Sequence, residues 1–178
     1  ALPAVAVRQP GLGAALSGGA PLPPDGHLFM VFGGTAAAFP ETLSLDDVFT
    51  DVGRRVWDLG WNDQNSHRLA DCLARAAHHE GPVMQFDTTK LDAWTDAFTK
   101  GSAAQRTPVA PVLVLRDAQF DDGPCPTPWQ LGYIQAVRDL GGEVTEKVYP
   151  DDDHFSLPGS SVDDAREWLA AQFDLADS

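Results

Sequence analysis

Side chains that could act as an acid and a base follow two predicted strands near the C-terminal end of the chain. Asp121 and Asp122 come after the apolar run 111–115, and His154 comes after the run 143–150. A helical pattern separates the two runs, so strand, helix and strand follow one another. Because the carboxyl ends of parallel strands meet at one edge of a sheet, we expect a carboxylate and the imidazole side by side there.

This pair has the chemistry of the orienting acid and the general base in a nucleophilic triad of the order Ser…Asp…His. The carboxylate holds one imidazole tautomer and stabilises the imidazolium, and the imidazole takes the proton from a hydroxyl nucleophile. The separation between Asp122 and His154, 154 minus 122 or 32 residues, suits one strand–helix–strand return.

The segment resembles the last strand–helix–strand of the α/β-hydrolase fold and, more narrowly, the secretory lipases of the lipase A type. Counted back from His154, Gly141 matches the helix-ending glycine of that family. Pro126 matches the proline four residues after the family's catalytic aspartate, which makes Asp122 the acid. Counting forward from the strand gives Phe120 instead, so the loop carries two extra residues and Asp121 stays a second candidate.

The resemblance implies a C-terminal fragment or subunit of a secreted serine ester hydrolase, a lipase or esterase that works through an acyl-enzyme. It covers nearly all of this chain but only about the C-terminal half of the family's length. The nucleophilic serine is expected on the N-terminal half, and activity is expected only when that half is bound. Because Ala1 is not a natural start, we expect a preceding segment to have been removed. The substrate would be a small-molecule or lipid ester, with no cofactor.

Two other interpretations remain open. The chain could be a non-catalytic remnant or binding module, in which Asp122 and His154 are ordinary loop residues. It could also belong to a peptidase or a polyester hydrolase of the same fold, because the same acid and base serve all of these reactions.

Ser17 lies in a relaxed version of the nucleophile-elbow motif, Ala15-Leu16-Ser17-Gly18-Gly19. An elbow needs a buried strand before the serine and a helix that begins at it. The strand signal here is weak, and prolines at 21, 23 and 24 prevent a helix soon afterwards. A Gly-rich loop is therefore the favoured interpretation.

Three segments are expected within an α/β fold whose sheet is incomplete in this chain. The resemblance implies that residues 1–25 follow the nucleophile region of a hydrolase core, because Gly18-Gly19-Ala20-Pro21 looks like the family segment a few tens of residues after the nucleophile. Residues 26–106 show successive helical patterns without strand alternation, and the resemblance implies that they are a helical cap inserted into that core. Residues 107–178 would form the C-terminal strand–helix–strand–helix, leaving one apolar strand edge open.

The first helix of the expected cap carries Phe29 and Phe32. Caps of the resembled family form an acyl-binding tunnel, so these rings are candidates for contact with substrate. The alternative is that they are helix-packing core residues.

Two further helices are predicted from their first residues. Ser44 with Asp47 forms an approximate capping box, which predicts a helical stretch with apolar residues as far as Leu59. Ser161 is expected to cap the last helix, which would bury five apolar residues: Val162, Ala165, Trp168, Leu169 and Phe173.

Composition narrows the classes of partner. A net charge of −14 argues against a nucleic-acid or anionic-membrane surface and suits an extracellular medium. No apolar run approaches the roughly 18 residues of a membrane span. Cys72 and Cys125 permit one disulfide, with two reduced thiols as the alternative. Adjacent histidines on a helix, such as 78 and 79, point about 100° apart and cannot share an ion, so no metal site is predicted.

Overall fold

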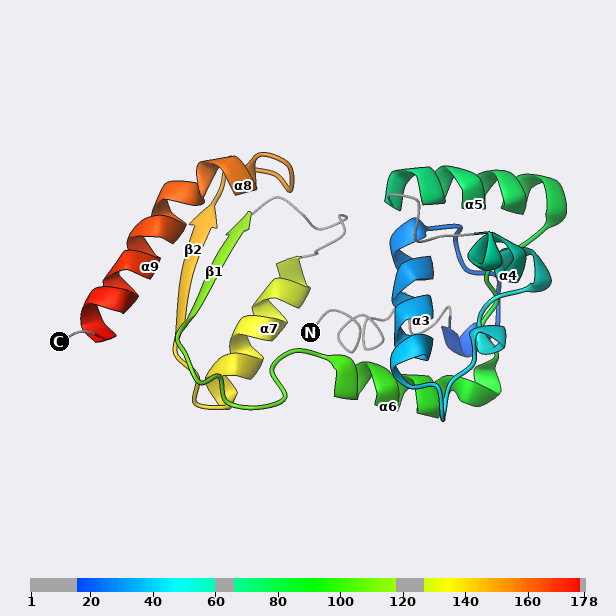
Figure 1. Ribbon diagram of the computed structural model, residues 1–178, viewed down its shortest axis with the longest axis horizontal. Coiled ribbons are helices and arrows are strands. Elements are labelled where there is room, and N and C mark those ends of the chain that lie inside the picture. The colour runs from blue at the N-terminus through cyan, green and yellow to red at the C-terminus, as the bar shows by residue number, and fades with distance from the viewer. Residues whose placement is uncertain (1–15, 60–65, 118–126, 177–178) are drawn as a thin grey trace. The chain divides into compact units, whose positions relative to one another are not determined.

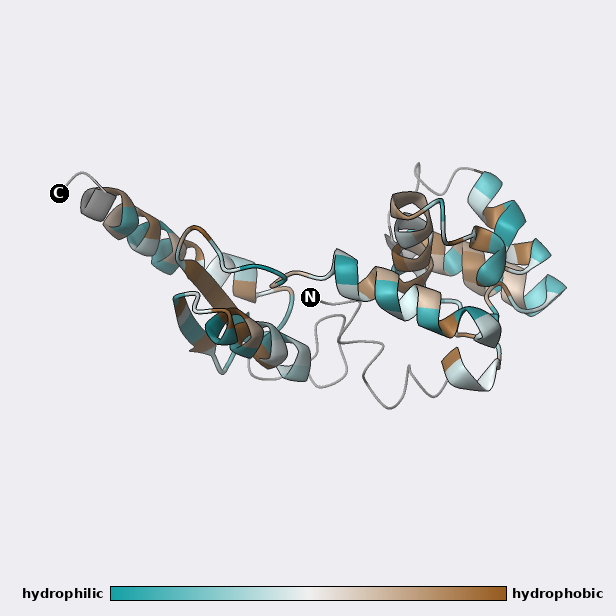
Figure 2. Cartoon of the chain, turned by 90° about the horizontal axis from the view of Figure 1, so that it is seen from below, coloured by the Kyte–Doolittle hydropathy of each residue, from teal (hydrophilic) through white to brown (hydrophobic). Residues whose placement is uncertain are grey.

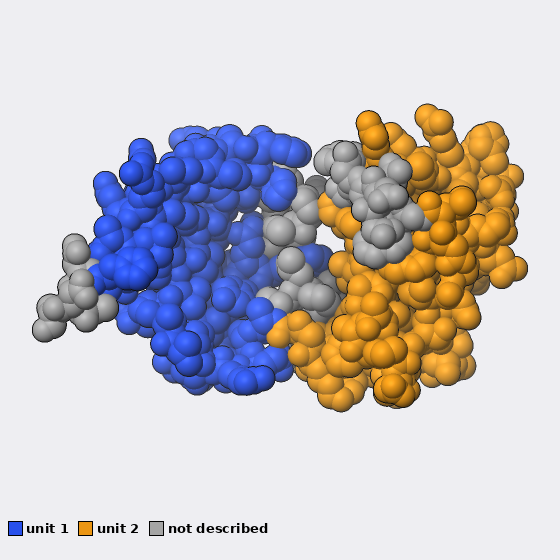
Figure 3. Space-filling model, viewed as in Figure 1, with its two compact units in different colours: residues 1–2, 103–178 blue, residues 3–102 orange. Residues whose placement is uncertain are grey.

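The computed structural model describes residues 16–59, 66–117 and 127–176 (Figure 1). These residues divide into two compact units (Figure 3). A helical unit ends at residue 102 and a sheet unit begins at residue 103. The chain thus passes from a helical part to a part with two strands between residues 102 and 103.

Besides a helical turn at residues 16–18, the described residues of the helical unit form four α-helices and two short 3-10 turns. The first helix begins where Asp25 accepts a hydrogen bond from the Leu28 amide at 2.8 Å, and it ends before Pro40. The helices are α3 (Gly26–Ala38), α4 (Asp51–Asp58), α5 (Ser66–Glu80) and α6 (Leu91–Gly101), and the turns are η1 (Leu45–Asp47) and η3 (Thr88–Lys90). Helix after helix was the expectation for this stretch, and it is confirmed.

The continuous helical stretch predicted from Ser44 to Leu59 is wrong. Both hydrogen bonds of the capping box form, but they start only the 3-10 turn η1. Phe49 then leaves the helical path and pairs with Met84 in an antiparallel bridge. Thr50 begins α4 by accepting the amide hydrogen of Gly53 at 3.2 Å. Burial of Phe49 and its backbone pairing with a distant segment outweigh the local helical preference.

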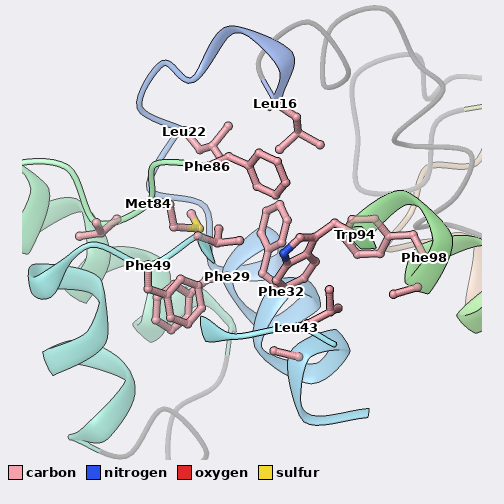
Figure 4. Packing of buried hydrophobic residues seen from close by; sticks show 14 of the residues in the cluster. Leu16, Leu22, Phe29, Phe32, Leu43, Phe49, Met84, Phe86, Trp94 and Phe98 are labelled. Atoms are coloured by element: carbon pink, nitrogen blue, oxygen red, sulfur yellow. The ribbon is translucent and has the colours of Figure 1, made fainter. Parts of the chain in front are cut away.

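Aromatic rings form the centre of the helical unit (Figure 4). Phe29 stacks on Phe49 with ring centroids 4.2 Å apart, and Phe32 meets Trp94 edge-on at 5.3 Å. The indole Nε1 of Trp94 donates a hydrogen bond to Asp47 at 3.0 Å, so its polar atom is satisfied inside the core. This unit therefore encloses a hydrophobic core of its own.

Helix α3 packs closely at one glycine. Figure 2 shows α3 as hydrophobic over most of its length. A Cβ on Gly33 would lie 1.9 Å from the ring of Trp57, whereas a Cβ on the neighbouring Gly34 would meet nothing within 4 Å. Two adjacent glycines of one helix thus have opposite surroundings.

We predict opposite effects for alanine at these two positions. Gly33→Ala should destabilise the chain by about 1–3 kcal/mol or more, because the Trp57 ring has to move. Gly34→Ala should stabilise it by up to about 1 kcal/mol through helix propensity. Urea unfolding followed by circular dichroism measures both. Equal losses in the two variants would contradict the close packing of Gly33 on Trp57.

The sheet unit follows the predicted order of strand, helix, strand and helix. Its elements are β1 (Val112–Asp117), α7 (Thr127–Asp139), β2 (Val144–Tyr149), α8 (Leu157–Ser160) and α9 (Val162–Ala176). The two strands are parallel, in a register that runs from Val112↔Val144 to Asp117↔Tyr149. Within the described ranges the sheet has two strands, so the class is mixed α/β with an incomplete sheet.

One face of this sheet is held to α7 by an ion-pair network. Glu146 of β2 accepts a hydrogen bond from Arg116 Nε at 2.6 Å and lies 3.7 Å from Arg138 of α7. The side chains of Glu146 and Arg116 are mostly buried. The charges therefore position β1, β2 and α7 together.

The opposite face is held to α9. Lys147 and Tyr149 of β2 both bond to Asp164. The hydrogen bonds from Lys147 and then from Tyr149 lower the pKa of Asp164. One turn further along α9, Trp168 Nε1 donates to Thr145 Oγ1 at 3.3 Å. Because successive residues of a strand point to opposite faces, α7 and α9 cover different sides of the sheet.

Three of the five residues predicted to be buried on α9 are exposed, so that prediction is wrong. Leu169 is 49% exposed and Phe173 is 69% exposed, and Val162 is also exposed. Two strands give α9 too little surface to cover its apolar face. On α7, by contrast, Ile134 and Val137 are buried.

Candidate functional site

His154 lies in the turn between β2 and α8. Asp153 holds the backbone of this turn, because its Oδ1 accepts the amide hydrogens of Phe155 and Ser156, each at 2.9 Å. Ser156 Oγ accepts the Asp153 amide hydrogen at 2.9 Å. The imidazole itself is exposed and contacts Phe155, with ring centroids 5.4 Å apart and ring planes at 79°. The turn thus presents His154 to the solvent on a fixed backbone.

Two carboxylates near His154 accept hydrogen bonds from residues close to them in the chain. Backbone hydrogen bonds from Ser156 and Phe155 lower the pKa of Asp153 because they stabilise its ionised form. Asp152 Oδ1 accepts a hydrogen bond from Ser160 at 2.9 Å, which ties the turn to α8. Two of the acidic residues before His154 therefore have structural partners.

Asp121 and Asp122 lie outside the described residues. The structure gives the two ends of their loop, which are the last residue of β1, Asp117, and the first residue of α7, Thr127. Asp117 pairs in register with Tyr149, at the carboxyl edge from which the His154 turn leaves. The order of elements agrees with the predicted site, and contact between Asp122 and His154 stays a prediction.

The sequence interpretation missed Asp117. This carboxylate is only 4% exposed, and its Oδ1 has no hydrogen-bond partner within the part of the chain that the structure describes. A buried polar atom without a partner is costly and is often part of a functional or incomplete site. The available signal was an acidic residue directly at the end of an apolar strand, before the loop that carries Asp121 and Asp122.

Ser17 does not have the backbone of a nucleophile elbow. It is exposed within a helical turn, and its φ is not positive, whereas an elbow places its serine on a sharp, strained strand-to-helix turn. Gly19, which has φ 62°, is bonded through its carbonyl to Gln85 Nε2 at 3.0 Å. Leu16, just before the serine, is fully buried in the core of the helical unit. The segment is thus anchored to the helical unit rather than to a strand of the sheet.

Phe29 and Phe32 are core residues of the helical unit. Their side chains are 0% and 1% exposed, while Val31 between them is 38% exposed. Substrate contact by either ring stays a prediction, and in this arrangement it requires the surrounding core to open.

No metal site or disulfide is present among the side chains that the structure describes. Cys72 is a free, exposed thiol, and Cys125 lies outside the described residues. No three His, Cys, Asp or Glu side chains of the described ranges gather as metal ligands would. His78 and His79 are exposed, and their rings stand at 75° to each other.

Comparison with known proteins finds no match to a family model, to a curated protein or to a solved structure. Across the described ranges, no helix is long and apolar enough to span a membrane. The evidence for the candidate site is therefore the order of its strands and helix and the chemistry of its residues.

The turn at Asp153 should lose its hydrogen bonds to the Phe155 and Ser156 amides in acid. Its lowered folded-state pKa means that the carboxylate stabilises the turn above the unfolded pKa of about 3.9, and that this stabilisation is lost as the pH falls through the lower folded value. Proton NMR of the Phe155 and Ser156 amides should show a shared titration with a midpoint below 3.9. Asp153→Ala should remove that titration, whereas Asp139→Ala, on α7, should leave it in place. A midpoint above about 4 would contradict the hydrogen-bond assignment.

Proposed function

We propose that this chain is the C-terminal part of a serine ester hydrolase of lipase or esterase type, which supplies the acid and the base of a Ser-Asp-His triad. One observation supports this proposal above the others. The parallel β1–α7–β2 unit ends in the His154 turn, at the edge from which the loop of Asp121 and Asp122 also leaves. Open α/β sheets keep their chemistry at this edge.

In the proposed reaction, His154 takes the proton from a serine hydroxyl of the N-terminal half as that oxygen attacks the ester carbonyl. The protonated imidazole then gives the proton to the leaving alcohol, and the acyl group stays on the serine. Water, activated by the same imidazole, releases the acid. Asp122 would hold the imidazole tautomer and stabilise its charged form, with Asp121 as the second candidate. The Asp153 hydrogen bonds suit the role of His154 as the base, because they fix the backbone of its turn while the imidazole remains accessible.

Substitution of the acid and the base tests the proposal. In the enzyme assembled with its N-terminal half, His154→Ala should lower kcat on a p-nitrophenyl ester by about 10³-fold or more. Asp122→Asn should lower it nearly as much, and Asp121→Asn much less. His79→Ala replaces another exposed histidine and should leave kcat unchanged. The reverse order of the two aspartates would transfer the acid role to Asp121.

The chain without its N-terminal half provides the control. It should show no turnover, because His154 then has no hydroxyl to activate. Robust turnover that Ser17→Ala abolishes would overturn the division of the triad between two parts.

The helical unit is proposed to act as the cap over the acyl site. Substitution of Phe32 tests whether its ring contacts the acyl chain of the substrate. Phe32→Ala and Phe86→Ala each remove a buried ring from the same core, and each should cost about 3–5 kcal/mol of stability. If Phe32 also contacts substrate, only Phe32→Ala should shift the preferred acyl length of the assembled enzyme. Equal shifts in the two variants, or none, would make Phe32 a core residue alone.

A binding module is the second candidate function. It is favoured by the apolar surface that α9 leaves exposed at Leu169 and Phe173. A chain that associates tightly with its N-terminal half, but whose complex hydrolyses no ester, would support this candidate instead.

A further inference from the structure

Residues 103–111 connect the helical unit to the sheet unit and belong to no helix or strand (Figure 1). Their backbone makes no hydrogen bond to another residue of the described ranges. Most of them are exposed, and Ala104 has a positive φ of 59°, a conformation that glycine adopts more readily than alanine. Because no backbone hydrogen bond has to break, this connection can open while both units stay folded.

Each end of the connection is held within its own unit. Ser102 Oγ donates a hydrogen bond to the Phe98 carbonyl at 2.6 Å, at the end of α6. Thr107 Oγ1 donates to the Leu140 carbonyl at 2.6 Å, after α7. Both anchors use side-chain oxygens, so they leave the backbone between them unpaired.

Prolines keep this backbone extended. A proline disfavours the helical conformation of the residue before it, so Pro108 and Pro111 hold Thr107 and Ala110 in an extended conformation. An extended peptide with unpaired N–H and C=O groups is the form in which a binding cleft can add main-chain hydrogen bonds. The connection therefore has the backbone that the active-site cleft of an endoprotease requires.

Arg106 differs from the other basic residues in its local structure. The chain has 12 Lys and Arg residues, and Arg8 lies outside the described residues, so 12 minus 1 leaves 11. Ten of these 11 lie in helices, 3-10 turns or strands. Among the described residues, Arg106 is thus the one basic residue in a segment without secondary structure, and its side chain is exposed.

The sequence around Arg106 contains no carboxylates. Residues 97–116 include no Asp or Glu, although the whole chain has 26 of them among 178 residues. Endoproteases of the trypsin type bind a basic side chain through an aspartate in their specificity pocket. Acidic residues near the cut would be repelled by that aspartate, and this stretch has none.

We propose that the Arg106–Thr107 peptide bond is the site at which an endoprotease of the trypsin type cuts the folded chain. Water adds across the bond and leaves a carboxylate on Arg106 and an ammonium group on Thr107. The cut removes the covalent link between the helical unit, which has its own hydrophobic core, and the sheet unit, which carries His154. The inference does not depend on the proposed hydrolase function, because it uses only the connection and its anchors.

Lys100 provides a matched comparison six residues before Arg106. Its side chain is 63% exposed and forms an ion pair with Asp96 at 2.6 Å. Its backbone lies in the last turn of α6, so a protease would have to unwind the helix to reach the bond that follows it. Both charges are exposed, whereas only the Arg106 backbone lies outside a helix.

Limited digestion of the full chain with trypsin tests the proposal. Every chain in the test carries Arg8→Gln, because Arg8 lies outside the described residues. The first cut should fall after Arg106, at a rate about tenfold or more above that at any other Lys or Arg, and the masses of the two fragments identify the bond. Arg106→Gln should lower the total rate of cleavage about tenfold or more, whereas Lys100→Gln should change it by less than about twofold.

Three results would overturn the proposal. The first is an initial cut at another bond, and the second is an equal effect of Arg106→Gln and Lys100→Gln. The third is a cleavage rate after Arg106 that rises with urea in step with global unfolding followed by circular dichroism. In that case the bond would be reached only in the unfolded chain, and the connection would not open by itself.

Discussion

The parallel ladder between β1 and β2 fixes the sheet edge from which the His154 turn leaves. Because the strands run in one direction, Asp117 and Tyr149 end at the same edge, and both following loops leave from there. The same ladder separates Glu146, which faces α7, from Lys147, which faces α9. A two-stranded sheet is marginal by itself. The contacts of its two faces with α7 and α9 are therefore what support it.

The fold was predictable where the signal is local. Helical periodicity and end signals predicted α3, α5, α6 and α7 from neighbouring residues alone. The prediction failed at Phe49, because its partner Met84 lies 84 minus 49, or 35, residues away. It failed again at Leu169 and Phe173, since periodicity identifies the apolar face of a helix but not the width of the sheet available to cover it.

Some residues of the candidate site could likewise be predicted from the sequence, and others could not. The position of His154 after β2 followed from the order of strands and helix, so it could be predicted. The burial of Phe29 and Phe32 could not, because α3 is apolar on most sides and its sequence does not distinguish an inner from an outer face. Asp117 was missed because the acid was sought in the loop after the strand, where a family pattern pointed, and not at the strand's last residue.

The short connection between β1 and β2 also determines when the sheet unit can form. Each register pair joins residues that are 32 positions apart, as in 144 minus 112, so closing the ladder requires only a modest loop. Contacts of such low sequence separation form early in folding. The β1–β2 ladder is therefore expected to form as a local unit, at a rate that does not depend on the concentration of the chain.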